Sequence, residues 1–547
     1  MKKIALLSIL IFGACTDLDL KPANGDVDSV VFKDFDSYKK YLAKVYAAFS
    51  LTGQQGPSGQ PDITIVNDEG FTSYIRSYWK VQELTTDEAV IAWTDAGIQD
   101  LHRLSWSSTN QFVRVLYYRI FYIIAYANDF IGQSTDELLT ERGMTDAQKN
   151  EIRVFRAEAR FLRALAYWHA LDLFRNVPII TSITAALPVQ ATPEDLFAFI
   201  EEELVAIEAD MAEPMANEYG RADKAANWML QAKMFLNAES MGVTISGGRN
   251  PYTECAANCQ KIFDAGYSLA PNYRELFMAD NHRFATSEMI FALPQDGISS
   301  QSWGSTTFLV HGALGKRMVD KKDDADNTTN YPTEDVDLYG VSGGWAGMRT
   351  TSVMVDHFSD GVAVPYTEDP RGVFYTNGQT LAIADVLDFA QGYAVPKFSN
   401  LTSTGQKGSN VTHCDTDYPL FRLADAYLMY GEAVLRGGTG DLNAATNYFN
   451  LLRERAYGST AGNISVGTID LDLILDERVR ELHWEGTRRI DLIRYGYFSN
   501  RIPGSERLWP WKGGEADGVS VNKHLEIMPI PSSDLEANPN LVQNDGY

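Results

Sequence analysis

Three tryptophans stand in segments that carry neither a helical nor a strand period. Trp303 and Trp345 are flanked by Ser and Gly, in SQSWGST and SGGWAGM, and Trp93 closes a short apolar run in VIAWTDAG. Such flanks favour exposure at loop positions. An exposed indole face can stack on the C–H face of a sugar while polar side chains bond the hydroxyl rim. The three residues are therefore candidates for glycan binding, although core packing is an equal alternative for each one alone.

Carboxylate pairs offer a different chemistry. Glycoside hydrolysis needs two carboxyl groups flanking the scissile bond, and Asp68–Glu69 and Asp87–Glu88 provide adjacent acids. Adjacent acids are commonplace in a chain with 72 Asp and Glu residues, and Glu88 in TTDEAV fits a short capped helix. No H-E-x-x-H zinc motif and no P-loop motif occurs. The sequence therefore predicts a binding protein that is not an enzyme and has no catalytic residues.

The charge balance narrows the class of ligand. The chain of 547 residues has 47 Lys and Arg against 72 Asp and Glu, a formal net charge of -25. Phosphate backbones and anionic lipid headgroups are repelled by such a surface. We therefore expect no nucleic-acid partner and a ligand that is neutral or cationic. Stacking and hydroxyl contacts satisfy this condition because neither depends on net protein charge.

The N-terminus predicts export and lipidation. Lys2 and Lys3 give a basic start, an apolar stretch follows over 4–12, and Gly13-Ala14 precedes Cys15. The apolar stretch is too short to span a bilayer, so residues 1–14 are expected to be a signal peptide. Cleavage before Cys15 would expose that cysteine for lipid attachment, and several acyl chains together make a stable anchor. Plain secretion is the alternative, because Phe12 replaces the leucine usual at this position.

Helical periodicity dominates the rest of the chain. The pattern predicts stacked helical pairs similar to tetratricopeptide repeats, with Trp168, Trp228 and Trp484 in their core. Cys255 and Cys259, four residues apart on one helix, are expected to be buried and unbridged. The predicted helices span 36–49, 111–131, 146–174, a segment capped by Thr192, 222–239, 256–264, 418–435 and 471–495.

The period breaks down between about 287 and 410. Gly, Ser, Thr, Asn and Asp clusters there separate short stretches such as MIFAL and FLVHG, which indicates a loop-rich lobe with short strands. Long irregular segments on a regular scaffold are typical of binding loops. The predicted fold class is mainly α: a helical scaffold over about 35–285 and 415–500, with the loop-rich ligand-binding lobe beside it.

Four segments have a distinctive sequence: AEARFLRALAYWHALDLFRNVP, YPLFRLADAYLMYGEAVL, ERVRELHWEGTRRIDLIRYG and the ending IMPIPSSDLEANPNLVQNDGY. Together they resemble the SusD family, also called SusD/RagB, of Bacteroidetes outer-membrane glycan receptors. The resemblance implies one SusD-like domain over 15–547, anchored by lipid in the outer membrane and facing the cell exterior. It also implies delivery of a bound glycan to a SusC-like TonB-dependent transporter.

The resemblance is strongest to the starch-binding member of that family, around QELTTDEAVIAWTDAG, QDGISSQSWGSTTFLV and GGWAGM. It implies that Trp93, Trp303 and Trp345 form an arc suited to coiled α-1,4-glucan, with starch or maltooligosaccharide as ligand. Asp68 and Arg76, in NDEGFTSYIR, match positions that bond sugar hydroxyls. A surface salt bridge is an equal alternative for Arg76, and Asp95 is left open. A different glycan, or a peptide as in the RagB-like branch, is the alternative ligand.

Two aspartates suggest a metal site. Asp280 in FMADN and Asp415 in CDTDYP resemble acidic loops of the family, and calcium takes oxygen ligands from separated segments. The alternative is that both are ordinary turn residues. No cofactor is expected to be required, with calcium at these two positions as the single candidate.

Overall fold

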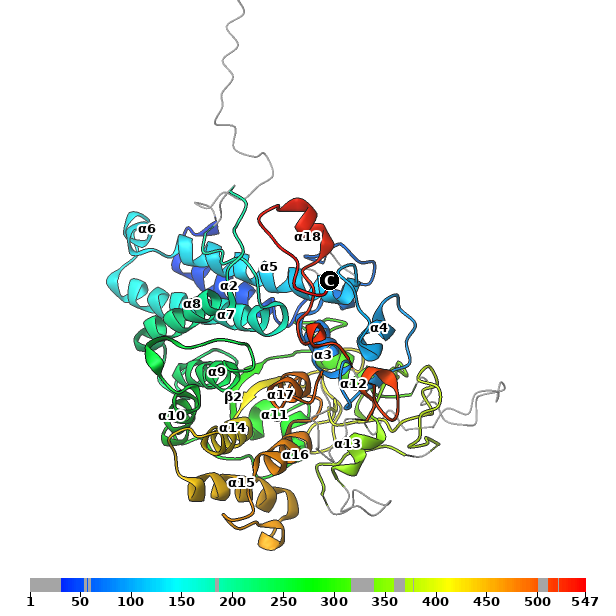
Figure 1. Cartoon of the computed structure of the whole chain (residues 1–547). Coiled ribbons are helices and arrows are strands. Elements are labelled where there is room, and N and C mark those ends of the chain that lie inside the picture. The colour runs from blue at the N-terminus through cyan, green and yellow to red at the C-terminus, as the bar shows by residue number, and fades with distance from the viewer. Residues whose placement is uncertain are drawn as a thin grey trace, which may run out of the picture.

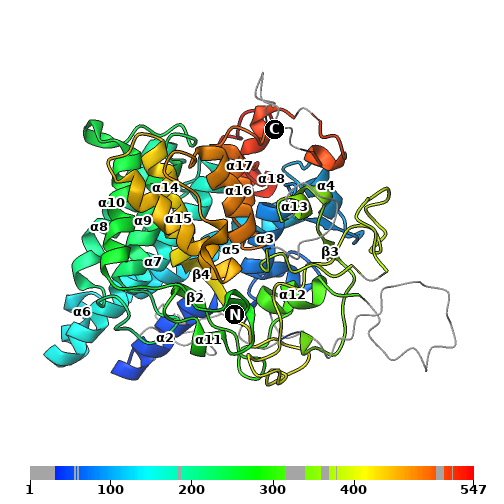
Figure 2. The ribbon, with the colours of Figure 1, turned by 90° about the horizontal axis from the view of Figure 1, so that it is seen from below.

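A computed structural model gives the architecture (Figure 1). The structure describes residues 31–53, 57, 61–182, 186–315, 339–358, 369–376, 378–499, 510–519 and 521–547. Helices stack along one side of the molecule. Loops that carry short helices and strands fill the other side, as the view from below also shows (Figure 2). The predicted fold class, a mainly α scaffold with an irregular lobe, is confirmed.

The scaffold consists of amphipathic helices packed side by side, mostly next to helices close in sequence. α5 packs on α7, α7 on α8, α9 on α10, α10 on α14 and α14 on α15. This is the predicted stacking of helical pairs. The bounds are α2 (Phe35–Ala47), α5 (Gln111–Gln133), α6 (Asp136–Glu141), α7 (Asp146–Phe174), α8 (Pro193–Ile207), α9 (Lys224–Asn237), α10 (Pro251–Asp264), α14 (Leu423–Leu435), α15 (Leu442–Tyr457), α16 (Leu471–Leu482) and α17 (Arg488–Arg494).

Side-chain caps fix where these helices begin. The Thr145 side chain accepts from the backbone amide of Gln148, and the Gln148 side chain accepts from the backbone amide of Thr145. These two bonds form a capping box at the start of α7. Thr192 caps α8 in the predicted way, with Pro193 in the first turn. Both caps satisfy amide groups that have no partner inside the helix. The N-terminal boundaries of these two helices therefore follow directly from the sequence.

The lobe contains short helices and two antiparallel strand pairs. β1 (Val90–Ile91) pairs with β3 (Met348–Arg349), and β2 (Met289–Leu293) pairs with β4 (Tyr418–Arg422). MIFAL forms β2, as the lobe pattern suggests. The short helices beside these strands are α3 (Tyr74–Glu83), α4 (Ile98–Arg103), α11 (Asn281–Phe284), α12 (Ser305–Gly312) and α13 (Ser352–Asp356).

Three predictions about the elements that follow residue 300 are wrong. FLVHG lies in helix α12 and is not a strand. The predicted helix over 418–435 begins with strand β4, whose residues bond to β2 before α14 starts. The predicted helix over 471–495 is two helices, because the chain turns at Trp484 and Gly486, which have φ of 62° and 77°. A right-handed helix cannot continue through residues in this left-handed region.

The expected core residues are largely inside. Trp168 and Trp484 are buried, whereas Trp228 is half-buried on α9. Cys255 and Cys259 are buried free thiols on α10. Among the described residues, no helix is both long enough and apolar enough to cross a membrane.

A buried ion network joins the end of the scaffold to the lobe. The guanidinium of Arg422 contacts the carboxylates of Glu288, Glu481 and Glu485 at 2.9, 2.5 and 2.7 Å. Arg371 contacts Glu477 and Glu481 at 2.7 and 2.9 Å. These side chains are almost completely excluded from water, so each charge depends on its partner for stabilisation.

A tryptophan-lined candidate binding site

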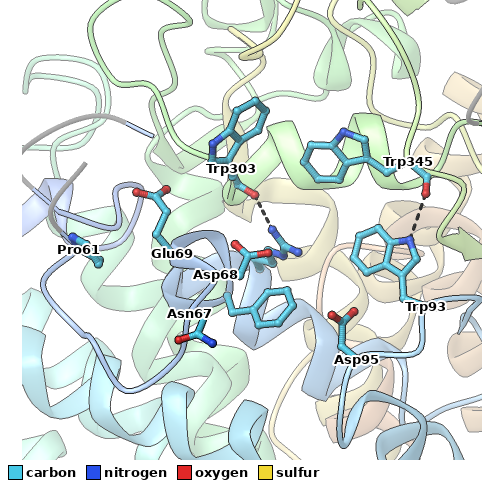
Figure 3. A pocket seen from close by; sticks show the side chains of 10 residues that line it. Pro61, Asn67, Asp68, Glu69, Trp93, Asp95, Trp303 and Trp345 are labelled. Atoms are coloured by element: carbon cyan, nitrogen blue, oxygen red, sulfur yellow. Dashed lines mark hydrogen bonds between the residues drawn. The ribbon is translucent and has the colours of Figure 1, made fainter. Parts of the chain in front are cut away.

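An open cavity of about 730 Å³ lies where the lobe meets residues 61–95 (Figure 3). All three tryptophans singled out from the sequence line it, and each is half-buried. The complete lining is Pro61, Asn67, Asp68, Glu69, Phe71, Arg76, Trp93, Asp95, Trp303 and Trp345. The cavity therefore combines aromatic faces with carboxylate, amide and guanidinium groups.

The short sheet of β1 and β3 places Trp93 beside Trp345. Trp93 lies two positions after β1 and Trp345 lies three positions before β3, so antiparallel pairing brings them together. The Trp93 Nε1–H donates to the carbonyl oxygen of Trp345 at 3.1 Å. Gln99 donates to the carbonyl of Trp93 at 2.7 Å, which fixes the turn that follows. Backbone pairing and two side-chain bonds thus hold the first indole.

Helix α12 positions the other two tryptophans. Trp303 stands just before the helix, and Trp345 lies against its C-terminal end. There the amides of Trp345, Ala346 and Gly347 donate to the carbonyls of His311, Leu314 and Gly312 at 2.8, 2.7 and 3.0 Å. These bonds satisfy carbonyl groups that a helix end leaves without partners. One short helix therefore supports both rings.

Gly304 permits a close approach between α12 and α3. A Cβ at this position would lie 2.0 Å from the Ser73 side chain. The Ser73 hydroxyl accepts from the amides of Arg76, at the start of α3, and Ser305, at the start of α12. The residue that caps α3 thereby also fixes the start of the helix that follows Trp303.

The three indole rings form a continuous row. The centroids of Trp93 and Trp345 are 6.2 Å apart with 43° between the planes, and those of Trp345 and Trp303 are 6.1 Å apart with 56°. The successive tilts give the row a bend instead of a flat stack, and the rings border the same cavity (Figure 3). Such a surface can stack on several consecutive sugar rings.

Arg76 lies behind this row in a buried position. Its Nη1 donates to the Trp303 carbonyl oxygen at 2.9 Å. Its guanidinium carbon lies 5.6 Å from the Trp93 ring centroid and 5.8 Å from that of Trp345. Burial lowers the pKa of Arg76 to about 10, although Asp68, Asp95 and Glu69 oppose the shift. The guanidinium therefore remains charged at neutral pH and contacts aromatic faces as a cation.

A second basic side chain, that of Lys80, is buried next to Arg76. The Nζ of Lys80 lies 4.3 Å from the Phe71 ring centroid and 4.2 Å from that of Phe112. It has no hydrogen-bond partner among the described residues. Burial and the neighbouring charge of Arg76 lower the pKa of Lys80 well below its usual value. Burial in this apolar setting penalises the charged form of the amine.

Three carboxylates face the cavity. Asp68 is exposed and accepts from the Gly70 amide at 2.9 Å, which caps a short 3-10 turn over Glu69–Thr72. Glu69 is buried and accepts from the Thr52 hydroxyl at 3.1 Å. Asp95 is half-buried in the turn after Trp93. Carboxylate oxygens at such a rim can accept hydrogen bonds from sugar hydroxyls.

The structure brings together all five residues predicted from the sequence, namely Trp93, Trp303, Trp345, Asp68 and Arg76. Their role in ligand binding stays a prediction. Arg76 is not in a surface salt bridge, because it is buried and bonds a backbone carbonyl. Asp95, left open by the sequence, also lines the cavity. Sequence reasoning missed Pro61, Asn67 and Phe71, although the last two belong to the same NDEGFTSYIR segment.

The other acidic candidates lie elsewhere. The predicted short helix at Glu88 is wrong: this residue is in a turn before β1. Asp87 is buried in an ion pair with Arg488 at 2.7 Å, and Glu88 accepts from the Trp484 amide at 3.0 Å. Neither lines the cavity, so this pair cannot flank a glycosidic bond there. Asp68 and Glu69 do line it.

The two proposed calcium ligands hold loops together. Asp280 accepts from the Ser403 amide and hydroxyl at 2.7 and 2.8 Å. Asp415 accepts from the Gly297 amide and the Ser409 hydroxyl, both at 2.7 Å. The described part of the chain contains no cluster of three or more His, Cys, Asp or Glu side chains that could hold a metal ion. Calcium at these positions stays a prediction. Cys15, the expected lipid site, lies outside the described residues.

The stack of helical pairs beside an irregular lobe is the fold of solved SusD-like proteins, and sequence comparison gives the family. A model of the SusD family matches residues 371–547. Starch-binding protein SusD of Bacteroides thetaiotaomicron is 35% identical, over 100% of this chain and 97% of the relative. The chain therefore belongs to the SusD family.

Other proteins match this chain at lower identity. SusD-like protein P25 of Formosa agariphila is 24% identical over 73% of this chain and 74% of its own. Surface glycan-binding protein A from Bacteroides thetaiotaomicron, solved in complex with laminarihexaose, aligns with a TM-score of 0.65 at 18% identity. That alignment covers 93% of this chain and 99% of the other. A laminarin-binding SusD-like protein gives 0.64 at 22% identity, covering 94% and 99%.

Proposed function

We propose that this protein binds starch and maltooligosaccharides through the row formed by Trp93, Trp345 and Trp303. The observation that carries the proposal is that three indoles far apart in the sequence border one open cavity, with 6.1 to 6.2 Å between neighbouring rings. A bent aromatic row fits a ligand whose successive rings turn in one direction, as in α-1,4-glucan. Asp68 and Arg76 would bond the hydroxyl rim.

The relatives support a glycan ligand and give one alternative. The 35% identical relative is named a starch-binding protein, and its likeness extends over the whole chain. Two structural neighbours bind laminarin or laminarihexaose, at 22% and 18% identity. A β-linked glucan is therefore the second candidate. The greater identity and full coverage favour the α-linked ligand.

The proposed cellular role is capture at the outer membrane. The signal-peptide pattern before Cys15 supports a lipid anchor, and family membership supports a position on the cell exterior. The bound oligosaccharide would pass to a SusC-like TonB-dependent transporter. Co-purification with such a barrel from outer membranes, lost when Cys15 is replaced by Ser, tests the anchor and the partner together.

Isothermal titration calorimetry with purified protein tests the ligand. Maltoheptaose, cyclic maltooligosaccharides and laminarihexaose form the panel, and Trp345→Ala is the test variant. We expect binding of the α-linked ligands and a loss of about thirtyfold or more in the variant, as for a central aromatic contact. Trp228→Ala is the matched control, since Trp228 is also half-buried but lies on α9. Preference for laminarihexaose would contradict the starch assignment.

We further propose that binding occurs without hydrolysis. Asp68, Glu69 and Asp95 are the acids that line the cavity, and Asp68 and Glu69 are already engaged in the local bonds described above. Maltoheptaose incubated with the protein should therefore remain intact, as judged by chromatography. Shorter products that disappear in Asp68→Asn would instead establish a hydrolase.

A further inference from the structure

The Trp345 indole rests on a buried histidine. The imidazole of His311 lies 5.0 Å from the Trp345 ring, centroid to centroid, with only 17° between the planes. His311 is 2% exposed and belongs to α12. It does not line the cavity, whereas Trp345 does. The imidazole therefore supports the indole without being available to a ligand.

His311 also joins two loops. Its Nδ1 lies 2.5 Å from the Gly343 carbonyl oxygen, and its Nε2 lies 3.0 Å from that of Thr412. Its own carbonyl accepts from the Trp345 amide at 2.8 Å. One residue thus contacts the segment before Trp345, the Trp345 backbone, the Trp345 ring and the loop around 412.

The same loop supports the neighbouring tryptophan. His413 lies 4.6 Å from the Trp303 ring, centroid to centroid, and its Nδ1 lies 3.3 Å from the Ser302 carbonyl oxygen. The peptide Thr412–His413 therefore contacts His311 on one side and Trp303 on the other. This peptide therefore links His311, which packs on Trp345, to His413, which packs on Trp303.

We infer that His311 is a positioning residue for the glycan site, which sets the angle of Trp345 relative to Trp93 and Trp303. The inference rests on the proposed function. Without the imidazole, the Trp345 ring loses its parallel neighbour, and the loop around 412 loses one of its contacts with α12. The indole can then rotate into the vacated space, and the row of rings loses its fixed bend.

A displaced Trp345 ring should lower the affinity for long oligosaccharides more than the affinity for short ones. Maltoheptaose can contact all three indoles, so its affinity depends on their relative angles. Maltose is too short to span the row and can bind where one or two rings are still in place. Loss of His311 should therefore reduce the ratio of maltoheptaose to maltose affinity. A variant that simply lowers the fraction of folded protein would reduce both affinities equally.

Two substitutions each remove one part of the imidazole's contribution. His311→Phe keeps a flat ring beneath Trp345 and removes both polar contacts. His311→Gln keeps a hydrogen-bonding group and removes the ring. We expect each to weaken maltoheptaose binding by about tenfold, the effect of losing one or two buried contacts, with less than about twofold change for maltose.

His524→Phe is the matched control, because His524 also packs on an aromatic ring, that of Tyr547, but lies in the C-terminal tail. Calorimetry is run on all variants after thermal unfolding has shown that each is folded. If His311→Phe does not fold, His413→Phe provides the same test through Trp303.

Failure of the wild-type protein to bind either α-glucan would refute the proposed function. Wild-type binding with an unchanged affinity ratio in the His311 or His413 variants would overturn the inference alone.

Discussion

The indole N–H of Trp93 donates to the backbone carbonyl of Trp345 at 3.1 Å, across 252 positions of sequence. An indole has a single polar hydrogen, and here it is used inside the protein. Trp93 can therefore contact a sugar through its ring face but has no N–H left for a hydroxyl. The same bond sets the spacing of the two rings, so one interaction determines both the chemistry and the geometry of this part of the site.

The Trp93–Trp345 bond predicts different effects for two substitutions of Trp93. Trp93→Ala removes the ring and should weaken maltoheptaose binding by about 2 kcal/mol or more. Trp93→Phe keeps an aromatic face but removes the donor, so we expect a smaller loss, about 1 kcal/mol. Calorimetry measures both. Equal losses would mean that the hydrogen bond, and not the ring face, accounts for the contribution of Trp93.

Gly347 is required for the approach of the Trp93 ring. A Cβ at Gly347 would lie 2.6 Å from Cε2 of that indole, so Gly347→Ala must displace the ring. We expect a loss of glycan affinity of about tenfold with a stability change of about 1 to 3 kcal/mol from overpacking. Gly343→Ala in the same loop is the control, because a Cβ there meets no atom within 4 Å. A normal affinity in Gly347→Ala would show that the ring adapts without cost.

Much of the helical scaffold could be predicted because each helix is specified by residues within its own segment. The predicted bounds of α7, 146–174, agree with the structure, since a capping box begins the helix and an apolar stripe continues through it. The start of α14 could not be predicted in the same way. YPLFR and the residues after it form one apolar run, and only pairing with β2 makes its first part a strand.

In the candidate site, too, the residues with a local sequence signal could be predicted and those that depend on distant contacts could not. Trp303 and Trp345 could be singled out because Ser and Gly around them exclude a helical or strand pattern. His311 could not, because it belongs to an apolar helical segment and its importance comes from contacts with Gly343 and Thr412. Phe71 reaches the cavity through packing that the chain's local pattern does not encode. Residues that support the site are harder to predict than residues that form its surface.

The carboxylates at the rim predict selectivity against anionic glycans. Asp68, Glu69 and Asp95 line the cavity, and the whole chain carries -25. A sulfated maltoheptaose should bind at least about tenfold more weakly than the neutral sugar, because like charges at short range cost about 1 to 4 kcal/mol. The difference should narrow at high salt and in Asp68→Asn. Calorimetry at two salt concentrations measures it, and equal affinity for both sugars would contradict the prediction.

The buried ion network predicts a large loss of stability when its central cation is removed. Arg422 is 1% exposed and contacts three carboxylates. Arg422→Met should lower the free energy of unfolding by about 3 to 5 kcal/mol, since the remaining carboxylates lose a buried partner. Denaturant unfolding measures the change. Lys39→Met is the control, because the Lys39–Glu218 pair is largely exposed and contributes at most about 1 kcal/mol.

Two buried carboxyl groups hold the turn between α16 and α17. Glu83 accepts from the amides of Gly486 and Thr487 at 2.6 and 3.1 Å, and Glu88 accepts from the Trp484 amide at 3.0 Å. Burial raises the pKa of Glu88 to about 7, and the charge of Arg488 opposes the shift. Burial, with the neighbouring Glu88, also raises the pKa of Glu83 well above its usual value. Protonation of these two carboxyl groups therefore stabilises the folded state.

This raised pKa predicts a pH-dependent stability with a definite sign. In the unfolded chain Glu88 loses its proton near its ordinary pKa of 4.5, whereas in the folded protein it does so at about 7. The stabilising contribution is complete below the lower value and disappears as the pH rises to the upper one. Glu88→Gln, which stays neutral, should therefore gain stability relative to the wild-type protein across this interval. Thermal unfolding at several pH values measures the gain, with exposed Glu536→Gln as control. A constant difference between Glu88→Gln and wild type would show that Glu88 does not titrate there.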